Sequence, residues 1–449
     1  MKRCSILFIL FVLGITTSQA QNTRALTLDE AIQLSLQNSK QLKLEQAKIK
    51  EATAGLREAR DNQLPDVSAT GSYLRLDDPK VDLKLKLGGP QQENSSANPL
   101  SNIKINSVAY GLATASLPIF SGFRIHYGIE AQKYLLQAAH LDADKNKEDV
   151  IANTIQAYSN LYKAQLSISI IQEYIKEAQS RVTDFINLEK NGTLVHNDVL
   201  KAQLQVSNLR LSLMDASKNF DMATLSMNLM LGLPDSLILT TDSNSFHSLS
   251  DTGNISDWVQ NALQNRKDIA ALSVREKAAN TNIKAIKGEY YPGIALTGNY
   301  IAADIPNLLT VDNALGIGLG LKYNLSSLWK TNAKVMQARA QQEQLVINQE
   351  MLADNVQIQV TQAYKDYVIS LQKINVYESA LQEAYENYKI TQAKYYNKVV
   401  SSTDLLDADN AQIQANLNYV FSKVDAAVAY YKLLENSGLL ANNLNIQSK

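Results

Sequence analysis

The second half of the 449-residue chain repeats the first half, and the repeat includes both helical and strand-like segments. Residues 29–73 align without a gap with residues 256–300, at an offset of 227, and further along the offset is 206. The smaller offset means that the first copy has about 21 additional residues after Tyr73. A period of about 200 residues is too long for a solenoid unit, so we predict a duplicated half-protein. The matched pairs include Asn38 and Asn265, Pro65 and Pro292, Tyr158 and Tyr364, Asp198 and Asp404, and Gly232 and Gly438.

The first twenty residues have the pattern of a secretory signal peptide: two basic residues, an apolar run over residues 6–15 and a Ser-Gln-Ala end at Ala20. The only cysteine, Cys4, precedes the apolar run, so the mature chain is expected to have no disulfide and no thiolate metal site. No later apolar stretch reaches the roughly 18 residues of a transmembrane helix. We expect a signal peptide at 1–20, a first repeat at 21–236, an equatorial linker at 237–255, a second repeat at 256–442 and a C-terminal tail at 443–449.

The composition argues against several classes of function. A net charge of −1 does not favour a nucleic-acid partner. The four histidines lie far apart without the spacing of metal ligands, and no nucleophile–base pair or phosphate-binding loop is visible. The alternating glycines Gly316, Gly318 and Gly320 fit strand packing rather than a nucleotide loop. We therefore expect no enzyme activity, no cofactor and no bound metal.

Apolar and small residues recur at a 3.5-residue spacing in both halves, as they do in a coiled-coil seam. In the first half we predict helices over residues 29–63, 122–190 and 196–230, of which the second would span roughly 100 Å and the others roughly 50 Å each. One long helix then matches two shorter ones placed end to end, which predicts an elongated cylinder wall with a belt near mid-height. An ordinary helical bundle would show the same seams. The longest seam joins Leu161, Ala164, Ile168, Ile171, Ile175, Ala178, Val182 and Phe185, and its counterpart joins Tyr367, Ser370, Ile374, Tyr377, Leu381, Ala384, Tyr388 and Thr391.

Short segments of period two lie between the helices and predict strands over about residues 67–76, 108–119, 294–300 and 315–323. Any one of them would fit an edge hairpin on a soluble domain. Four strands cannot close a barrel, open edges are not tolerated in lipid, and the smallest membrane barrels have eight strands. Three chains would supply twelve, which predicts a trimer around one barrel, with the polar loop 77–106 on the extracellular side. An aromatic girdle would consist of Tyr73, Tyr110, Tyr300 and Tyr323.

On these features the chain resembles the outer-membrane efflux proteins, the TolC-like channels. The resemblance runs from about residue 26 to residue 440. It is carried by Leu64-Pro65 and Tyr291-Pro292 at helix ends, by Leu-Pro-Ile-Phe-Ser-Gly at 117–122, by Asn-Gly-Thr-Leu-Val-His-Asn-Asp-Val-Leu at 191–200, and by the repeat of that hairpin sequence at 397–408.

The resemblance implies a mainly α fold with a β-barrel segment. It implies a homotrimer whose twelve-stranded outer-membrane barrel, four strands from each chain, continues into a long periplasmic α-helical coiled-coil tunnel. The location would be the outer membrane of a Gram-negative bacterium, in contact with its lipid and with most of the mass in the periplasm. The function would be passive exit of small molecules delivered by an inner-membrane pump and a periplasmic adaptor, without catalytic residues.

Two other functions remain open at this stage. The exit duct of a type I protein secretion system has the same fold, and sequence does not separate it from a drug-efflux channel. A periplasmic coiled-coil scaffold without a pore is the other, and the paired strands argue against it.

The resemblance also implies roles for named residues. The hairpins at Gly192 and Lys398 would form the closed end of the tunnel and the adaptor-docking tips, with Thr193, Val195 and Val399. Lys398 stands where a glycine is expected, which predicts a tighter tip or a different docking contact.

Asp404 and Asp407 match the family's paired aspartates at the tunnel constriction, and Asp198 is the first-half equivalent of Asp404. In a trimer Asp404 and Asp407 would form two carboxylate rings, with Asp198 at the same constriction; such rings favour cations and raise the pKa of some carboxyl groups. The alternative is that Asp404 caps its helix and Asp407 is a solvated acid of the first turn. A group of methionines fits core packing better than a metal-ion route: Met214, Met222, Met227 and Met230.

Overall fold

The computed structural model describes residues 23–77, 105–242, 246, 252–306 and 308–444. The expected signal peptide, most of the polar loop 77–106 and the end of the expected C-terminal tail lie outside the described residues. The chain forms two units: unit 1 comprises residues 1–47, 140–270 and 350–449, and unit 2 comprises residues 48–139 and 271–349. Each unit takes segments from both sequence repeats.

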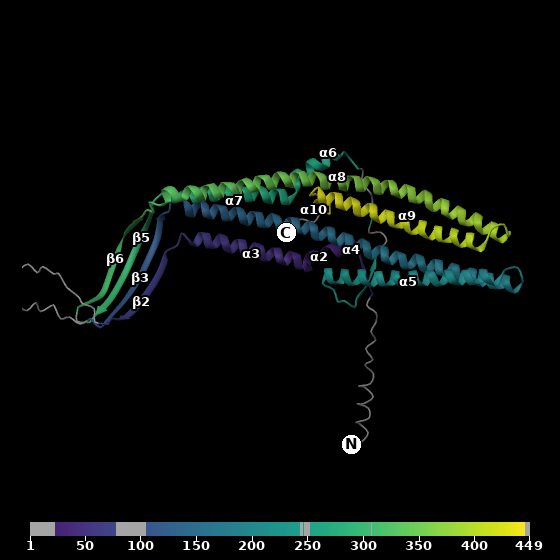
Figure 1. Cartoon of the computed structure of the whole chain (residues 1–449), viewed down its shortest axis with the longest axis horizontal. Coiled ribbons are helices and arrows are strands. Elements are labelled where there is room, and N and C mark those ends of the chain that lie inside the picture. The colour runs from purple at the N-terminus through teal and green to yellow at the C-terminus, as the bar shows by residue number, and fades with distance from the viewer. Residues whose placement is uncertain (1–22, 78–104, 243–245, 247–251, 307, 445–449) are drawn as a thin grey trace, which may run out of the picture. The chain divides into compact units, whose positions relative to one another are not determined.

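Unit 2 contains a four-stranded antiparallel sheet in the order β2-β3-β5-β6 (Figure 1). All four strands predicted from the period-two pattern are confirmed, although β6 begins at Leu309, before the expected start. The central pair, β3 with β5, joins the first repeat to the second. The strands are β2 (Asp66–Arg75), β3 (Ser107–Phe120), β5 (Gly293–Ile305) and β6 (Leu309–Lys322).

Two glycines cross closely where this sheet meets the helices of unit 2. Gly122 has a φ of 65°, and a Cβ on it would lie 2.2 Å from the carbonyl oxygen of Gly288. A Cβ on Gly288 would lie 2.4 Å from the carbonyl oxygen of Gly122. Only glycine permits this approach. The crossing holds the start of α4 (Arg124–Lys190) beside η1 (Gly288–Tyr290), the 3-10 turn that follows α7 (Lys267–Lys287).

The first helix of each repeat is interrupted, so the prediction of one helix over residues 29–63 was wrong. The chain forms α2 (Leu28–Asn38) and α3 (Lys40–Asp61), separated by Ser39, whose ψ of 121° is not helical. The Ser39 hydroxyl accepts a hydrogen bond from the Leu42 amide at 3.3 Å and restarts the helix. In the second repeat Arg266, with a ψ of 128°, separates α6 (Ile255–Asn265) from α7. Ser39 and Arg266 are equivalent at the offset of 227, so the duplication preserves the break.

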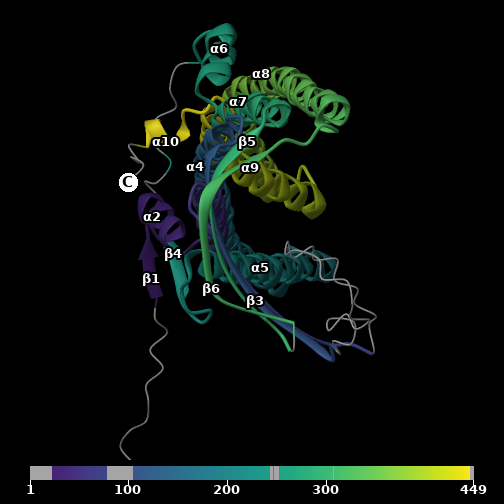
Figure 2. The same cartoon turned by 90° about the vertical axis from the view of Figure 1, so that its left-hand side faces the viewer.

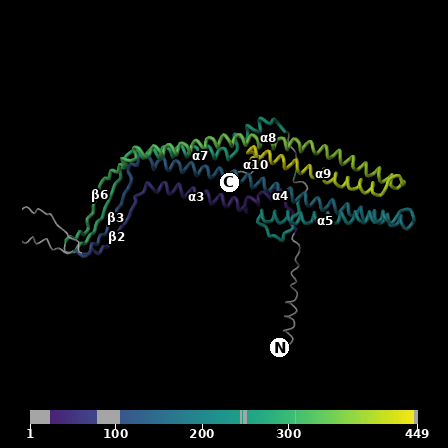
Figure 3. The backbone as a smooth tube through the Cα atoms, viewed as in Figure 1, coloured from purple at the N-terminus to yellow at the C-terminus, as the bar shows by residue number. Residues whose placement is uncertain are grey.

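Unit 1 contains two helical hairpins (Figure 3). The second part of α4 turns back into α5 (His196–Leu231), and the second part of α8 (Ser327–Tyr396) turns back into α9 (Ser402–Asn436). The predicted seams are confirmed, because Leu161, Phe185 and Tyr367 are fully buried. In α8 four seam positions are each less exposed than both of their neighbours in the sequence: Ile374, Tyr377, Ala384 and Tyr388. Leu381 is less exposed than Gln382 but falls in the same exposure class as Ala380.

A small two-stranded element was missed by the sequence analysis. In unit 1, β1 (Thr23–Leu26) pairs in parallel with β4 (Ile238–Thr241), which lies in the segment expected to be a linker. The buried Tyr158 hydroxyl donates a hydrogen bond to the Leu26 carbonyl oxygen at 2.8 Å. The short helix α10 (Leu440–Asn443) contributes the buried Leu440 to the same core. Four-residue strands are too short to show a period, so only their buried neighbours identify them.

Candidate functional site

The sheet of unit 2 has one apolar face and one polar or small-residue face. Directly paired residues of antiparallel strands share a face. Three rows form the apolar face. One row joins Val67, Ala115, Gly298 and Ile317; the rows on either side of it join Leu117, Leu296 and Leu319, and Ala113, Tyr300 and Leu315. Two rows of the opposite, polar or small-residue face lie between them. The first joins Ser68, Thr114, Asn299 and Gly316, and the second joins Asp66, Ser116, Thr297 and Gly318.

The apolar face is uncovered. On β6, Leu315, Ile317, Leu319 and Leu321 are each more than 70% exposed. Among the described residues of unit 2, no helix lies over either face of the sheet (Figure 1), whose strands β3, β5 and β6 are labelled in Figure 2. The strands β2 and β6 are both edge strands, and one side of each has no strand partner in the part of the chain that the structure describes. A sheet with an exposed apolar face and two open edges needs further chains, lipid or both.

The expected aromatic girdle is corrected by the strand register. Tyr110 pairs with Ser72 and Ala303, which places it on the polar face, whereas Tyr73 and Tyr300 lie on the apolar face. Side chains alternate between the two faces along β3, and Tyr110 lies three positions before Ala113, so these two side chains are on opposite faces. The four tyrosines therefore do not share one face.

The two hairpin turns of unit 1 have the same backbone geometry. Gly192 has a φ of 70° and Lys398 a φ of 60°. In the first turn the Gly192 amide donates to the carbonyl oxygen three residues earlier at 2.8 Å, and in the second turn the Lys398 amide does the same at 2.9 Å. The expectation that Lys398 makes the second tip tighter is therefore wrong: the lysine adopts the left-handed conformation that glycine adopts in the first turn.

The exposed tip residues lie beside a shared cavity. Val195 is 64% and Val399 68% exposed, both large values for aliphatic side chains. A cavity of about 290 Å³ lies between the two turns and is lined by Thr193, Val195 and Lys398, among others. Phe185 of α4 stacks on Tyr395 of α8 with ring centroids 5.2 Å apart. Three of the five predicted tip residues, Thr193, Val195 and Lys398, therefore line one cavity, and Gly192 and Val399 are chain neighbours of lining residues.

Polar contacts also join the two tips. Asp198 at the start of α5 accepts a hydrogen bond from the Ser402 hydroxyl, and Lys201 donates to the Thr403 hydroxyl at 2.9 Å. Asp198 is therefore placed between the hairpins rather than in open solvent, with its side chain 19% exposed.

Asp404 belongs to a capping box within a single chain. Its amide donates to the Ser401 hydroxyl at 3.2 Å, and its carboxylate accepts from the Ser401 amide at 2.8 Å. Hydrogen bonds from the Ser401 hydroxyl and amide lower the pKa of the Asp404 carboxyl. A ring of neighbouring carboxylates would instead raise the pKa of this carboxyl. Asp407, one turn later, is exposed.

A buried ion pair that the sequence analysis missed joins three helices of unit 1. Arg181 of α4 donates to both carboxylate oxygens of Asp409 of α9, at 2.8 and 3.0 Å, and to the Tyr388 hydroxyl of α8 at 2.8 Å. The two charged side chains are 7% and 3% exposed. Burial opposes the charge of the guanidinium, but its hydrogen bonds with Asp409 raise the pKa of Arg181 overall. The only sequence signal was a pair of opposite charges, Arg181 beside the seam residue Val182 and Asp409 in the helix that follows the second turn.

A sequence profile of the outer membrane efflux protein family matches residues 31–233 and 258–438. The chain belongs to the outer membrane efflux protein family.

The relatives of this efflux-family chain are named as efflux or export proteins. The cation efflux system protein CusC of Escherichia coli K12 is 23% identical over 86% of this chain and 81% of its own length. The outer membrane efflux protein BepC of Brucella suis is 22% identical over 73% of this chain and 72% of its own length. The toxin and drug export protein A of Aggregatibacter actinomycetemcomitans is 24% identical over 68% of this chain and 67% of its own length.

Solved channel structures share the fold. A crystal structure of CusC superposes with a TM-score of 0.75 at 19% identity, covering 93% of this chain and 92% of the other. The Campylobacter jejuni CmeC outer membrane channel gives 0.75 at 17% identity, with coverages of 92% and 86%. The efflux family and these neighbours are channels rather than enzymes, and the family indicates the outer membrane of a Gram-negative bacterium.

The described residues of this efflux-family chain show neither a cluster of three or more side chains that would hold a metal ion nor a helix long and apolar enough to cross a membrane. The methionines are corrected in part. Met227 is fully buried as expected, but Met214 and Met222 are 67% and 60% exposed and do not belong to the core.

Proposed function

We propose that the chain is the outer-membrane exit channel of a tripartite efflux system. It would conduct small molecules passively from an inner-membrane pump and a periplasmic adaptor to the outside. The observation that carries the proposal is the two-faced open sheet of unit 2. Its apolar face suits lipid, its polar face suits water, and its two unpaired edges suit pairing with further copies.

The proposed assembly is a homotrimer. Pairing β2 of one copy with β6 of the next would close a barrel of about twelve strands and remove every open edge, as lipid requires. The apolar face, with Leu315, Ile317 and Leu319, would face lipid. The opposite face, with Ser68, Thr114 and Gly316, would line the passage. The long helices would form the periplasmic coiled-coil tunnel, which would place most of the mass in the periplasm.

The hairpin tips are proposed as the adaptor-docking end and the gate. Val195, Val399 and the left-handed Lys398 present exposed apolar and basic groups at the two turns. Asp404 and Asp407 are proposed to form carboxylate rings at the constriction, and Asp198 to hold the two hairpins together beside it. In this proposal the trimer opposes the effect of the Ser401 hydrogen bonds on the pKa of Asp404, because neighbouring carboxylates disfavour ionisation.

Protein export is the second candidate function. The similarity to toxin and drug export protein A favours it, because that relative's name includes a toxin cargo. Both candidates use the same proposed channel, so a folded-polypeptide export assay beside a dye-efflux assay separates them.

Disulfide trapping tests the trimer directly. The only cysteine is Cys4, so introduced cysteines report without background once residues 1–20 are removed or Cys4 is replaced. We expect a cysteine on β2, such as Ser68→Cys, combined with a cysteine scan over residues 314–320 of β6, to give covalent dimers and trimers in isolated outer membranes. The matched control combines Thr114→Cys on the interior strand β3 with the same scan. Membrane-extracted protein that never yields a covalent oligomer would exclude the shared barrel.

Single-channel conductance in planar bilayers tests the gate. Wild-type protein is expected to give small, cation-selective events. The double variant Asp404→Asn/Asp407→Asn is expected to give larger or less selective events, because the proposed carboxylate rings are removed. Unchanged conductance would leave the channel in place but restrict these aspartates to capping and solvation, and no conductance would favour the scaffold.

A further inference from the structure

A cavity of about 410 Å³ lies in unit 1, where α4, α8 and α9 meet the break between α6 and α7. Each of the three helices contributes side chains to its wall, and the break contributes Arg266, Lys267 and Asp268. A space of this size is within the range of small-molecule sites and is far larger than a single water molecule needs. The proposed channel function assigns no role to this cavity.

Most of the charged side chains on the cavity wall neutralise one another in pairs. The pairs are Lys145 with Asp149 at 2.5 Å, Arg266 with Asp268 at 2.7 Å, and Lys432 with Glu435 at 2.7 Å. In the described part of the chain, three charged side chains of the wall have no ion-pair partner: Glu148, Lys267 and Asp366. Two carboxylates and one ammonium group leave one uncompensated negative charge when all three are ionised.

Glu148 of α4 is the buried member of this unpaired set. It is 8% exposed and has neither a hydrogen-bond partner nor an ion-pair partner among the described residues. The unpaired polar side-chain atoms that the described part of the chain encloses completely belong to Thr224, Asn228 and Tyr395. The Glu148 carboxylate is therefore unpaired but not sealed in, and it faces the cavity that it lines. Because an unpaired buried polar group is costly, this arrangement indicates a partner that binds from the cavity.

The charges around Glu148 show which kind of partner would stabilise it. Burial raises the pKa of Glu148 to about 7, and Asp149 on the same helix and Glu435 on α9 add to this effect. Lys267 and Arg266 at the break lower the pKa, but in the described part of unit 1 neither forms an ion pair with Glu148. A cation at hydrogen-bond distance stabilises an ionised carboxylate most. The partner that suits Glu148 is therefore positively charged.

An organic cation suits this site better than a metal ion. Calcium and magnesium ions take about six or more oxygen ligands, and the described residues include no group of three or more acidic, histidine or cysteine side chains that could hold a metal. A protonated amine needs less, because its N–H groups can donate to one carboxylate and to amide oxygens. Gln362 and Asn436 supply amide groups on the cavity wall.

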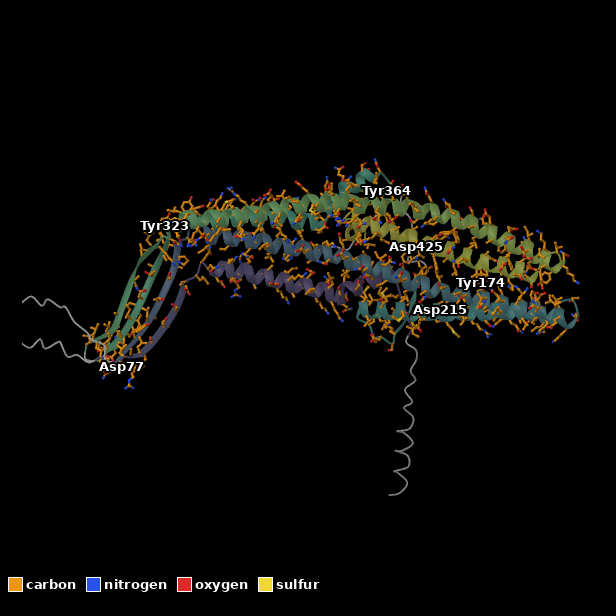
Figure 4. All side chains as sticks on the ribbon, viewed as in Figure 1. Asp77, Tyr174, Asp215, Tyr323, Tyr364 and Asp425 are labelled. Carbon is orange, nitrogen blue, oxygen red and sulfur yellow. The ribbon has the colours of Figure 1, made fainter. Side chains whose placement is uncertain are left out.

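A second cavity, of about 370 Å³, adjoins the first between α4, α8 and α9. The two cavities share Ala363, Asp366, Lys432 and Glu435. The second is also lined by the apolar side chains of Ala152, Ile155, Val428 and Ala429. Asp425, labelled in Figure 4, lies on its wall as well but is paired with Lys163. A charged space beside an apolar one fits a cation that carries a short hydrocarbon chain.

We propose that these two adjoining cavities bind a small amphipathic organic cation, a protonated amine with a short hydrocarbon chain. The ammonium group donates to the Glu148 carboxylate, and the hydrocarbon chain lies against Ile155 and Val428. Asp366, which is exposed and lines both cavities, attracts the cation at the entrance. The inference does not depend on the proposed channel, because every residue that it uses belongs to unit 1 of a single chain.

Calorimetric titration with n-butylammonium chloride tests the site in the full chain without residues 1–20, purified in detergent. The measurements are made at pH 6 and at pH 8, each in two buffers with different heats of ionisation, so that the protons released on binding are counted. 1-Butanol is the uncharged probe with the same chain, and methylammonium is the cation without the chain. The variant Glu148→Gln removes the carboxylate, and circular dichroism confirms its fold.

We expect the dissociation constant for butylammonium to fall about tenfold from pH 6 to pH 8, because Glu148, with a pKa of about 7, becomes largely ionised over this range. Binding at pH 6 should release about one proton, and binding at pH 8 almost none. Glu148→Gln should weaken binding at pH 8 at least about tenfold and remove the pH dependence. Methylammonium should bind at least about tenfold more weakly than butylammonium, because it lacks three methylene groups.

The duplication supplies the matched control. At the offset of 206 the equivalent of Glu148 is Asp354, an exposed acid on α8, and Asp354→Asn should leave both the affinity and the proton release unchanged. Equal affinities of the wild type and Glu148→Gln would overturn the proposal. So would butanol that binds as tightly as butylammonium, since the site would then recognise only the hydrocarbon chain. Folded protein that binds butylammonium at neither pH would overturn it as well.

Discussion

Glu148 of α4 is a buried acid without a hydrogen-bond or ion-pair partner among the described residues, and its side chain lines a charged cavity of about 410 Å³ in unit 1. Burial raises the pKa of Glu148 to about 7; Lys267 partly offsets this effect, while the nearby carboxylates of Asp149 and Glu435 add to it. The folded protein therefore holds a proton that the unfolded chain releases above a pH of about 4.5. Stability from this group is complete below that pH and is lost as the pH rises to about 7.

Glu148→Gln is expected to stabilise the protein at pH 8 by about 1 to 3 kcal/mol, because the amide needs no proton to stay neutral. At pH 4.5 the variant and the wild type should unfold at similar temperatures. Thermal unfolding followed by circular dichroism across this pH range is the measurement. Glu173→Gln, an exposed acid on the same helix, is the control and should show no such pH-dependent gain. An equal effect of both substitutions would contradict the assignment.

The turn at Lys398 predicts a second effect at single-residue scale. A left-handed backbone costs a lysine about 1 to 2 kcal/mol, while glycine loses about 0.5 to 1 kcal/mol of entropy on ordering. Lys398→Gly is therefore expected to stabilise the second hairpin by up to about 1 kcal/mol. Gly192→Lys, the reciprocal change, should destabilise the first hairpin by a similar or larger amount. Hydrogen exchange at the turn amides measures both, and a stabilising Gly192→Lys would refute the strain.

At the scale of elements, the pair of Arg181 and Asp409 decides how α4, α8 and α9 pack. Asp409→Ala leaves a buried guanidinium unpaired and is expected to cost about 3 to 5 kcal/mol. Tyr388→Phe removes only one hydrogen bond and should cost about 0.5 to 1.5 kcal/mol. Arg181→Met/Asp409→Leu should recover most of the loss, because it removes both charges together. Thermal unfolding of the four proteins provides the test, and a double variant as unstable as Asp409→Ala would mean that the charges themselves are needed.

The elements differed in how far they were predictable from sequence. Long seams and period-two strands were predictable because each residue there meets the same environment as its periodic neighbours. The breaks at Ser39 and Arg266 were not, because neither residue is a glycine or proline. Asn38, just before the first break, donates to the carbonyl oxygen of Leu231, a contact far along the chain. The Arg181 network was also not predictable, because its three members lie on three helices far apart in the sequence.

The candidate site was predictable unevenly for a physical reason. The turn positions Gly192 and Lys398 follow from local sequence, and the structure places both in left-handed turns. The position of Asp198 between the hairpins depends on Ser402, which is distant in sequence. The rings proposed for Asp404 and Asp407 involve other copies of the chain, and no local pattern distinguishes a ring from a cap.

At the scale of the whole molecule, the two faces of β6 predict opposite responses to charge. Ile317→Arg and Leu319→Arg place a cation on the apolar face and should each cost about 2 to 4 kcal/mol of insertion free energy near the middle of the bilayer. Gly316→Arg and Gly318→Arg are matched neighbours on the opposite face, where an added Cβ meets nothing within 4 Å. The amount of heat-resistant oligomer in outer membranes measures the difference. Equal losses from both pairs would contradict a lipid-facing apolar side.

The buried ion pair also constrains the history of the duplication. At the offset of 206, the position equivalent to Arg181 is Asn387 and the position equivalent to Asp409 is Gln203. The two halves are therefore no longer interchangeable, although their hairpins share length and turn geometry. Recombination that copied the first hairpin over the second would replace Asp409 with glutamine and leave Arg181 buried without its carboxylate. Recombination in the other direction would replace Arg181 with asparagine and leave the Asp409 carboxylate buried without its guanidinium. A single contact of this kind would make either exchange between the two halves unfavourable.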